Sequence, residues 1–428
     1  MYSRPQGAVR MTPLPPRLLL IAPPNSYRTA AYIAAARKNN IDVLVASEGR
    51  YSLSSDIAAG LHVDLQDPAA LSQLLEAGRE RPFAGVVATD DATVELGSRI
   101  AARLNLPHNP PEAAQISRRK HLSRQALAAA GVSIPDFTIL DLDQPLDPQL
   151  ADFILPGVVK PLSLSASRGV IRVDTRADAI SACSRIENIL AGESVADDYD
   201  ARHLLLESFV SGPEVAIEGL LHEGGLTVLA IFDKPDPMQG PYFEETYYIT
   251  PSRHAESDQQ RLIECTQDAC AAIGLREGPV HAELRIHAGQ PVVMEVAART
   301  IGGECARLLT FGTGHSLEEL IVMHAIGKPL QLAHAGGAAG VLMLPIPGNG
   351  ILRRIEGVRA ARAVPGITDV LVTIRDGYEL VQLPEGGSYL GFIFSQCPNA
   401  DMAEDALRQA HAELNVVIAP KFRLEDAR

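Results

Sequence analysis

The first hundred residues alternate short apolar runs with longer amphipathic segments. The apolar runs predict strands at Arg17–Ala22, Ile41–Ser47, Leu61–Leu65 and Ala84–Asp90. The amphipathic segments predict helices at Tyr27–Asn39, Asp67–Arg79 and Thr93–Leu104. This alternation predicts an open parallel sheet over residues 17–110. The turn after the first strand lacks the Gly-x-Gly-x-x-Gly of a dinucleotide site, although ligands also bind at the carboxyl ends of such strands.

The pattern changes after this sheet. Further helices are predicted at Ser117–Ala130, Asp178–Leu190, Ser257–Gly274 and Asn399–Leu414. The first of these is basic and is ended by Gly131 as a C′ residue. Short strands fill most of the remaining chain, and a passage rich in Gly, Ala and Pro spans residues 333–350. A Gly-rich turn follows at Glu385–Gly387, before the last predicted strand.

Two glutamates, twelve residues apart and followed by an arginine, carry the clearest chemical signal: Glu283, Glu295 and Arg299. Alternating polar and apolar positions predict a hairpin that turns at residues 288–290. A three-residue loop places Glu283 opposite Glu295, whereas a two-residue loop would place them on opposite faces. Facing carboxylates favour a cation between them, and Mg²⁺ prefers oxygen ligands and brings phosphates. The alternative is an exposed hairpin with two solvated glutamates.

Composition narrows the class of partner. The chain has 428 residues, 46% hydrophobic and 21% charged, which is typical of a soluble protein with several domains. Its net charge of −14 argues against nucleic acid as the main partner, so an anionic ligand needs local basic groups. No segment has the length to span a membrane. The cysteines are odd in number and form no CxxC pair, so we expect reduced thiols in a cytoplasmic protein.

Two strand pairs in the middle of the chain suit a nucleotide. Residues 157–170 predict a strand, a loop of small residues and a strand, with Lys160 at the root of the loop. Small residues let backbone N–H groups approach phosphate oxygens. The loop lacks the Gly-Lys-Ser/Thr of a Walker motif, and the alternative is an ordinary surface hairpin. The second pair, residues 203–218, turns at Gly212–Pro213 and carries Glu207 and Glu214.

Taken in order, these motifs resemble the ATP-grasp superfamily over residues 17–425. The resemblance implies an α/β and α+β fold: a Rossmann-like parallel-sheet domain, a mobile lid, a large mixed-sheet domain and a C-terminal α+β region. The implied boundaries are a loose extension (1–16), the N-terminal α/β domain (17–115), a basic helix (116–131), the lid (132–206), the large subdomain (207–330) and the C-terminal domain (331–428).

The resemblance also implies the ATP site. Lys120 matches the lysine before the lid, and Lys160 matches the lysine that enters the phosphate loop. The loop residues implied to meet phosphate are Ser165, Ser167 and Gly169. The adenine hinge, of the form Glu-x-aromatic-Val, is matched by Glu207, Phe209 and Val210, and the ribose-binding acid is matched by Glu214. Met294 lies where the family often has an apolar residue beneath adenine, and plain core packing is the alternative.

By the same resemblance, Glu283 and Glu295 hold the metal, and Arg299 steadies the transferring phosphoryl group, so Arg299, Lys160 and Glu295 form the catalytic set. Ala297 replaces the asparagine that commonly adds a metal ligand, which leaves the number of ions open. The Glu-x-Ala-Ala-Arg ending resembles the branch of L-amino-acid (dipeptide) ligases and carnosine synthases. Residues implied to meet substrate in that branch are Glu244 or Glu245, His254, Arg299, Gly302 and Gly303.

The implied activity is an ATP- and Mg²⁺-dependent ligase, with Mn²⁺ as an alternative ion. A small-molecule carboxylate is activated as an acylphosphate and joined to an amine, with release of ADP and phosphate. A homodimer is compatible with the sequence. Two alternatives stay open: a ligase or carboxylase of nucleotide or biotin metabolism, and a regulatory module that binds ATP without turnover.

Overall fold

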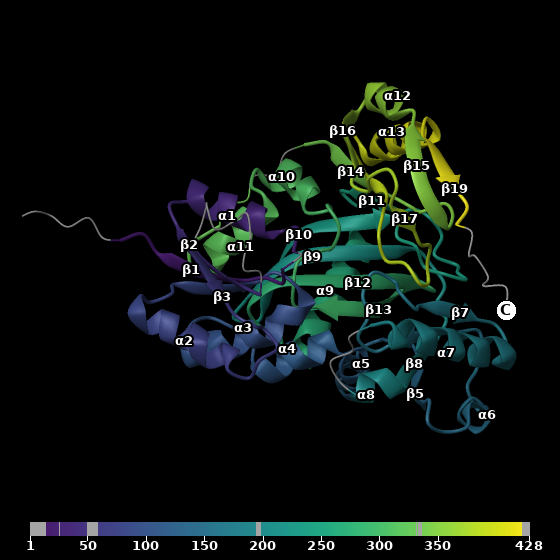
Figure 1. The fold of residues 1–428 in the computed structure, drawn as a ribbon, viewed down its shortest axis with the longest axis horizontal. Coiled ribbons are helices and arrows are strands. Elements are labelled where there is room, and N and C mark those ends of the chain that lie inside the picture. The colour runs from purple at the N-terminus through teal and green to yellow at the C-terminus, as the bar shows by residue number, and fades with distance from the viewer. Residues whose placement is uncertain are drawn as a thin grey trace, which may run out of the picture. The chain divides into compact units, whose positions relative to one another are not determined.

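The structure is a computed structural model that describes residues 14–24, 26–48, 59–193, 198–330, 332 and 336–421 (Figure 1). Residues 1–13 of the expected extension and part of the Gly/Ala/Pro-rich passage lie outside the described residues. The chain forms two compact units. The first comprises the residues up to Pro107 together with Glu318–Leu330, and the second comprises His108–Leu317 and the residues from Gln331 onward.

The first unit contains the predicted parallel sheet. Its strands lie in the order β3-β2-β1-β4 and pair in parallel. Their bounds are Ala59–His62 for β3, Asp42–Ser47 for β2, Arg17–Ile21 for β1 and Gly85–Ala88 for β4. The helices of this unit are α1 (Thr29–Lys38), α2 (Ala70–Glu80), α3 (Asp91–Arg103) and α11 (Leu317–Ala325). Apolar residues of both central strands, such as Leu19 and Leu44, are buried in its core, which confirms the prediction from the apolar runs.

Helix α11 joins this unit although it is distant in sequence. A Cβ atom on Gly85 would lie 2.3 Å from the Ala325 carbonyl oxygen, so only glycine permits this approach of β4 to the end of α11. Lys38 of α1 forms an ion pair with Glu319 of α11 at 2.6 Å. The expected boundary of the large subdomain includes residues 318–330, whereas their contacts group them with the N-terminal sheet.

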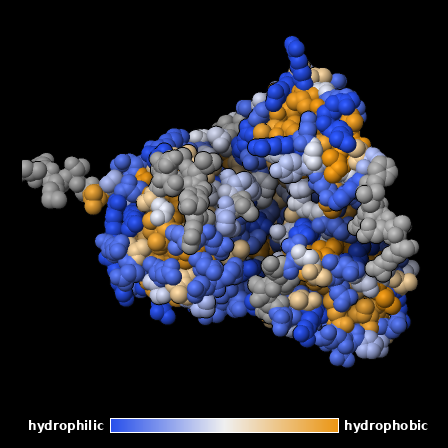
Figure 2. Space-filling view, viewed as in Figure 1, coloured by the Kyte–Doolittle hydropathy of each residue, from blue (hydrophilic) through white to orange (hydrophobic). Residues whose placement is uncertain are grey.

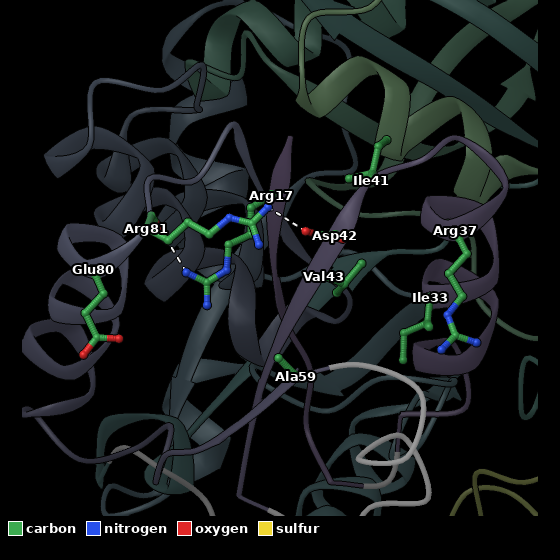
Figure 3. A pocket seen from close by; sticks show the side chains of 9 residues that line it. All are labelled: Arg17, Ile33, Arg37, Ile41, Asp42, Val43, Ala59, Glu80 and Arg81. Atoms are coloured by element: carbon green, nitrogen blue, oxygen red, sulfur yellow. Dashed lines mark hydrogen bonds and ion pairs between the residues drawn. The ribbon is translucent and has the colours of Figure 1, made fainter. Parts of the chain in front are cut away.

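A cavity of about 410 Å³ lies at the amino-terminal ends of β1 and β2 (Figure 3). Arg17 donates to the carbonyl oxygens of Ala77 and Arg81, and Arg81 pairs with Asp42 at 2.6 Å. These bonds tie the end of α2 to the first strands. Ligands of open α/β sheets bind at the carboxyl ends of the strands, which is the opposite edge. We therefore assign this cavity a structural role.

The second unit begins with two helices, α4 (Pro111–Arg118) and α5 (Lys120–Ala129). The prediction of one helix over Ser117–Ala130 is wrong at its start, because Arg119 adopts an extended backbone with φ −108° and ψ 112°. Gly131 ends α5 with a φ of +74°, as predicted. Lys120 and Arg124 lie four residues apart on α5 and therefore share a helix face.

The lid is a four-stranded sheet in the order β5-β8-β6-β7. Its strands are β5 (Phe137–Asp141), β6 (Gly157–Pro161), β7 (Ile171–Val173) and β8 (His203–Ser208). Its helices are α6 (Leu146–Gln149), α7 (Arg176–Ala191) and α8 (Asp198–Arg202). Helix α7 buries residues such as Cys183 and Ile186 against this sheet, and Thr175 caps its first turn by accepting a hydrogen bond from the Asp178 N–H.

The large sheet has eight strands in the order β13-β12-β9-β10-β11-β14-β18-β16, all paired antiparallel. The strands are β9 (Glu214–His222), β10 (Gly225–Lys234), β11 (Tyr247–Thr250), β12 (Gly278–His287), β13 (Gln290–Ala297), β14 (Ala338–Leu344), β16 (Ile367–Val372) and β18 (Gly391–Cys397). We had expected a mixed sheet. Strands of the C-terminal region continue the sheet that carries the carboxylate hairpin, since β11 pairs with β14.

The remaining elements complete this unit. A small sheet has the order β17-β15-β19, formed by Glu379–Leu380, Gly350–Glu356 and Asn415–Ala419. The helices are α9 (Glu256–Ile273), α10 (Arg307–Thr313), α12 (Val358–Ala363) and α13 (Ala400–Ala412). Helix α9 buries Leu262 and Cys270 in one core cluster, and α13 buries Ala403 and Leu407 in another.

The surface is mainly hydrophilic on the face shown in Figure 2. Exposed large apolar side chains, such as Ile154 and Tyr378, are few. Within the described residues, no helix combines the length and the apolar character that a membrane span requires.

Candidate active site

The adenine hinge is held by a buried clamp of charges. Glu207, near the end of β8, accepts hydrogen bonds from Arg124 of α5 at 2.6 Å and from Lys160 of β6 at 2.5 Å. Arg124 also donates to the carbonyl oxygen of Met294 on β13. All three charged residues are less than 10% exposed. The clamp thus joins the helix before the lid, the lid sheet and the carboxylate hairpin.

The electrostatics of the clamp depend on its burial. Burial alone would raise the pKa of Glu207, but Arg124 and Lys160 outweigh it, so the pKa lies below its ordinary value. Burial lowers the pKa of Lys160, and Glu207 only partly restores it. A buried carboxylate between two cations stays ionised, which keeps the hinge and the lid strand in one geometry.

The phosphate loop has the backbone of an anion-binding turn. Ala166, Ser167 and Gly169 have positive φ values of 54°, 56° and 69°. Such left-handed residues turn successive N–H groups toward one side. Lys120 donates to the Leu164 carbonyl oxygen at 2.7 Å, so the predicted first lysine does reach this loop. The Gly169 N–H, however, donates to the Pro384 carbonyl oxygen at 2.9 Å.

The carboxylate hairpin forms, but by a different geometry from the predicted one. Its loop contains two residues, Ala288 and Gly289, with φ values of 48° and 77°, and the expectation of three is wrong. A two-residue loop would separate the glutamates onto opposite faces. A β-bulge at Met294 inserts one extra residue, and Glu283 consequently pairs with Glu295 in the register.

A buried cluster of charges lies on the inner strands of the large sheet. The ammonium of Lys234 donates to Glu214 at 2.8 Å, to Glu245 at 2.8 Å and to Glu283 at 3.0 Å. The sheet register explains two of these contacts, since Lys234 pairs with Glu214 across β9 and β10, and Glu283 lies on the next strand. Lys234 is 5% exposed.

A second set of contacts supports this cluster. Arg285 donates to Glu214 at 2.8 Å and to the Val210 carbonyl oxygen of the hinge. His281 contacts Glu218 at 3.2 Å and Glu283 at 3.4 Å, so it helps to fix the position of the Glu283 carboxylate. The hinge residue Phe209 lies beneath the guanidinium of Arg172, 4.3 Å from the ring centroid.

These contacts shift the pKa values of the cluster. Burial opposes every charge, but three carboxylates raise the pKa of Lys234 well above its ordinary value. The pKa of Glu283 lies well below its ordinary value, because Lys234 and His281 outweigh burial. Burial raises the pKa of Glu245 to about 7, helped by the neighbouring Glu283 and opposed by Lys234. Glu218 and Glu283 raise the pKa of His281 to about 9 against burial.

The cluster fits a cation. Carboxylate oxygens of Glu214, Glu245 and Glu283 lie within 4.8 Å of one another. The Lys234 ammonium lies among these oxygens and supplies a positive charge there, and carboxylate oxygens are also the ligands that Mg²⁺ prefers. Glu295 lies opposite Glu283 and is half-buried, without an ion pair to any described residue.

The expected substrate residues are placed unequally. Glu245 belongs to the cluster. Glu244 instead faces the C-terminal region, where a hydrogen bond from the Ile346 N–H partly offsets the rise in its pKa that burial causes. His254 lies 3.9 Å from Asp233, the residue before Lys234. Arg299 donates to the Thr300 carbonyl oxygen. A Cβ atom on Gly303 would lie 2.9 Å from the Met343 sulfur, while one on Gly302 would meet nothing within 4 Å.

A cavity of about 550 Å³ opens beside the cluster. It is lined by the hinge turn at Gly212–Glu214, by Asp233–Pro237, and by Arg253 and His254. Arg253 pairs with Asp233 at 3.2 Å and with Glu404 of α13 at 2.7 Å. The C-terminal region therefore supports one wall of this cavity.

Sequence reasoning missed three of the central side chains. They are Arg124 of α5, Lys234 of β10 and Arg285 of β12. A usable signal existed for Arg285, because it shares strand parity with Glu283 and therefore points to the same face. Nothing local marks Arg124, whose partner Glu207 is 83 residues away.

Comparison with known proteins agrees with this geometry. Residues 153–307 match the ATP-grasp domain family, and residues 342–419 match the L-amino acid ligase C-terminal domain 2 family. The solved L-amino acid ligase of Bacillus licheniformis superposes with a TM-score of 0.82 at 25% identity, covering 95% of this chain and all of that one.

Two sequence relatives differ in how much they cover. An uncharacterized protein of Sinorhizobium fredii is 26% identical over 92% of this chain and 82% of its own length. Dapdiamide A synthase of Enterobacter agglomerans is 27% identical, but the match spans only 54% of each chain. The expected fold is thus confirmed: an ATP-grasp domain is followed by a region that matches the L-amino acid ligase C-terminal domain.

Proposed function

We propose that this protein is an ATP-dependent ligase that joins the carboxylate of one amino acid to the amine of another. The observation that carries the proposal is the buried cluster of Glu214, Glu245 and Glu283 around Lys234, on the sheet that also bears Glu295. Phosphoryl transfer needs positioned charge rather than a protein nucleophile. The match of residues 342–419 to an L-amino acid ligase domain supports amino acids as substrates.

Each part of the site has a proposed role. Lys120, Lys160 and the loop Ser165–Gly169 face the phosphates, while Glu283 and Glu295 hold Mg²⁺ or, as an alternative, Mn²⁺. A bound Mg²⁺ would neutralise charge on the β and γ oxygens of ATP. Arg299 stabilises the charge that develops on the transferring group.

The proposed reaction has two steps. A carboxylate oxygen of the first substrate attacks the γ-phosphorus of ATP, and the bond from this phosphorus to the bridging oxygen breaks. The products of this step are ADP and an acylphosphate. The amine nitrogen of the second substrate then attacks the acyl carbon, phosphate leaves, and the nitrogen loses a proton to form the amide. Water must be excluded between the steps because it would hydrolyse the acylphosphate.

Nucleotide analysis tests this proposal directly. The protein is incubated with ATP, Mg²⁺ and a mixed amino-acid pool, and the spent nucleotides are separated by chromatography. We expect ADP and phosphate to form only when amino acids are present, together with new dipeptides. AMP and pyrophosphate would replace the acylphosphate step with adenylation, and ATP binding without turnover would indicate a regulatory module.

A matched pair of variants tests recognition of the substrate amine. Glu245 contacts Lys234 in the cluster, whereas its neighbour Glu244 faces Ile346. We expect Glu245→Gln to reduce turnover of amino acids more than turnover of simple carboxylic acids. Glu244→Gln is the control and should affect both alike. Equal losses for the two substrate classes in Glu245→Gln would remove its role with the amine.

The cysteines support a cytoplasmic location for this enzyme. All of them are free, and Cys183 and Cys270 are buried. Burial raises the pKa of each of these two thiols to about 12, so they remain protonated and unreactive at neutral pH.

A further inference from the structure

The Gly-rich turn at Glu385–Gly387 contacts the lid. We call residues 382–387 the clasp. Its Pro384 carbonyl oxygen accepts a hydrogen bond from the Gly169 N–H at 2.9 Å, and its Glu385 carbonyl oxygen accepts one from the Arg168 Nε at 3.1 Å. Both donors belong to the phosphate loop. A loop of the C-terminal region therefore binds the backbone of the loop proposed to hold the phosphates.

An ion pair extends this contact to helix α7. Arg185 donates two hydrogen bonds to the Glu385 carboxylate, at 2.6 and 3.0 Å, in the bidentate geometry that favours arginine. Its third nitrogen donates to the Tyr242 hydroxyl, close to the Phe243–Glu245 stretch. The pair raises the pKa of Arg185 above its ordinary value, mainly through the hydrogen bond to Glu385.

The clasp itself is built to keep one conformation. A Cβ atom on Gly386 would lie 1.8 Å from the Val381 carbonyl oxygen, so glycine is required there. The Gln382 N–H donates to Asn349 at 2.7 Å, which fixes the turn to the C-terminal region. A Cβ atom on Gly387 would lie 2.5 Å from the Arg168 side chain, so the absence of a side chain lets Arg168 pack across the turn.

We propose that the clasp positions the phosphate loop, so that the C-terminal region sets how firmly the lid excludes water. The inference rests on the proposed ligase function for its chemical consequence. Glu385 is a positioning residue, since it acts only through Arg168 and Arg185, while its neighbour Pro384 binds Gly169. Loss of the clasp should loosen the loop and let water reach the acylphosphate.

Glu385→Ala tests the clasp, with Glu379→Ala as the matched control. Glu379 lies in the same C-terminal region, and among the described residues its carboxylate pairs with Lys421 rather than with a residue of the lid. Hydrogen exchange of residues 165–170 is measured with Mg²⁺ and a non-hydrolysable ATP analogue. The Arg185–Glu385 pair is 43% and 41% exposed, and an exposed pair of this kind is worth up to about 1 kcal/mol, so we expect exchange to quicken about fivefold. The control should match the wild type.

The second measurement is the number of amide bonds formed per ADP. Glu385→Ala should give fewer, because more acylphosphate is hydrolysed, whereas Glu379→Ala should not. Arg185→Ala approaches the same contact from the lid, and the exchanged pair Arg185→Glu with Glu385→Arg should recover part of the loss. Melting curves show that each variant is folded.

Loop exchange in Glu385→Ala and Arg185→Ala equal to that of the wild type would overturn the inference. The exchange measurement needs no turnover. If the wild type forms no amide, the proposed function fails and the clasp is still tested. If amide forms normally but the variants leave exchange unchanged, the clasp alone fails.

Discussion

Replacing Lys234 with methionine should reveal how far the charge cluster governs stability. Lys234 is 5% exposed and donates to three carboxylates at 2.8–3.0 Å. Methionine keeps much of the length but leaves those carboxylates without their cation. Removing one partner of a buried pair costs about 3–5 kcal/mol, out of a total stability of about 5–15 kcal/mol. With an unfolding entropy of about 2.1 cal/mol/K per residue, we expect the melting point of a chain of this size to fall by about 3–6 °C.

Far-UV circular dichroism suits this measurement, because the chain has no tryptophan for fluorescence. Lys421→Met is the control: it makes the same change in the exposed pair with Glu379, whose side chains are 54% and 48% exposed, and should cost about 1 kcal/mol or less. Adding Glu245→Gln to Lys234→Met should recover part of the loss by removing one uncompensated charge. The reasoning is wrong if Lys234→Met melts within about 2 °C of the wild type, as the control should.

Three further outcomes follow from the same contacts. Arg124→Met should lower the melting point by a similar amount, because Glu207 would keep only Lys160, whereas Arg118→Met should change stability by no more than about 0.5 kcal/mol. Because the pKa of Glu207 is lowered, its stabilisation is present above the ordinary value of 4.5 and is lost as pH falls through the folded pKa; acid titration followed by circular dichroism should show this loss at higher pH in Arg124→Met. Glu295→Gln should lower ADP formation at saturating Mg²⁺ by about a hundredfold or more with an unchanged melting curve, and turnover within about threefold of the wild type would remove its metal role.

The sequence predicted the parallel sheet because its signal is local. Strands β1 and β2 are short apolar runs, and such runs indicate strands buried on both faces, whereas the edge strand β3 is largely exposed and lies at Ala59–His62, two residues before its predicted start. The carboxylate hairpin was also predictable, since polar and apolar positions alternate over residues 281–287 and an apolar run follows the turn. Family resemblance supplied the order of the motifs, and residues 153–307 and 342–419 match the two expected families.

The loop of the hairpin shows where local patterns fail. Two residues, Ala288 and Gly289, form the loop, which by strand parity should separate Glu283 from Glu295. The bulge at Met294 corrects the parity. No local rule of alternation predicts a bulge within an apolar run. The pairing of Glu283 with Glu295 was therefore predicted correctly, but from a loop length that the structure does not have.

The break at Arg119 is a comparable case. Residues 117–130 contain good helix formers and no proline, so propensity predicts one continuous helix. The structure instead turns the chain at Arg119, which lets α5 direct Lys120 toward Leu164 and Arg124 toward Glu207. Long-range hydrogen bonds to buried partners outweigh a local preference worth a few tenths of a kcal/mol per residue.

The buried charges themselves argue for a site. Replacing a buried ion pair with apolar residues of similar volume is often neutral or stabilising, so stability alone does not require Lys234 among its glutamates or Glu207 between Arg124 and Lys160. The Glu207 clamp joins the lid to the helix before it, the Lys234 cluster lies on the large sheet, and each uses oxygen and nitrogen atoms that can exchange a protein partner for a metal ion or a phosphate. Local conflicts with the rules of core packing are expected at functional sites. The features that sequence patterns explain least are therefore the ones that the proposed chemistry explains best.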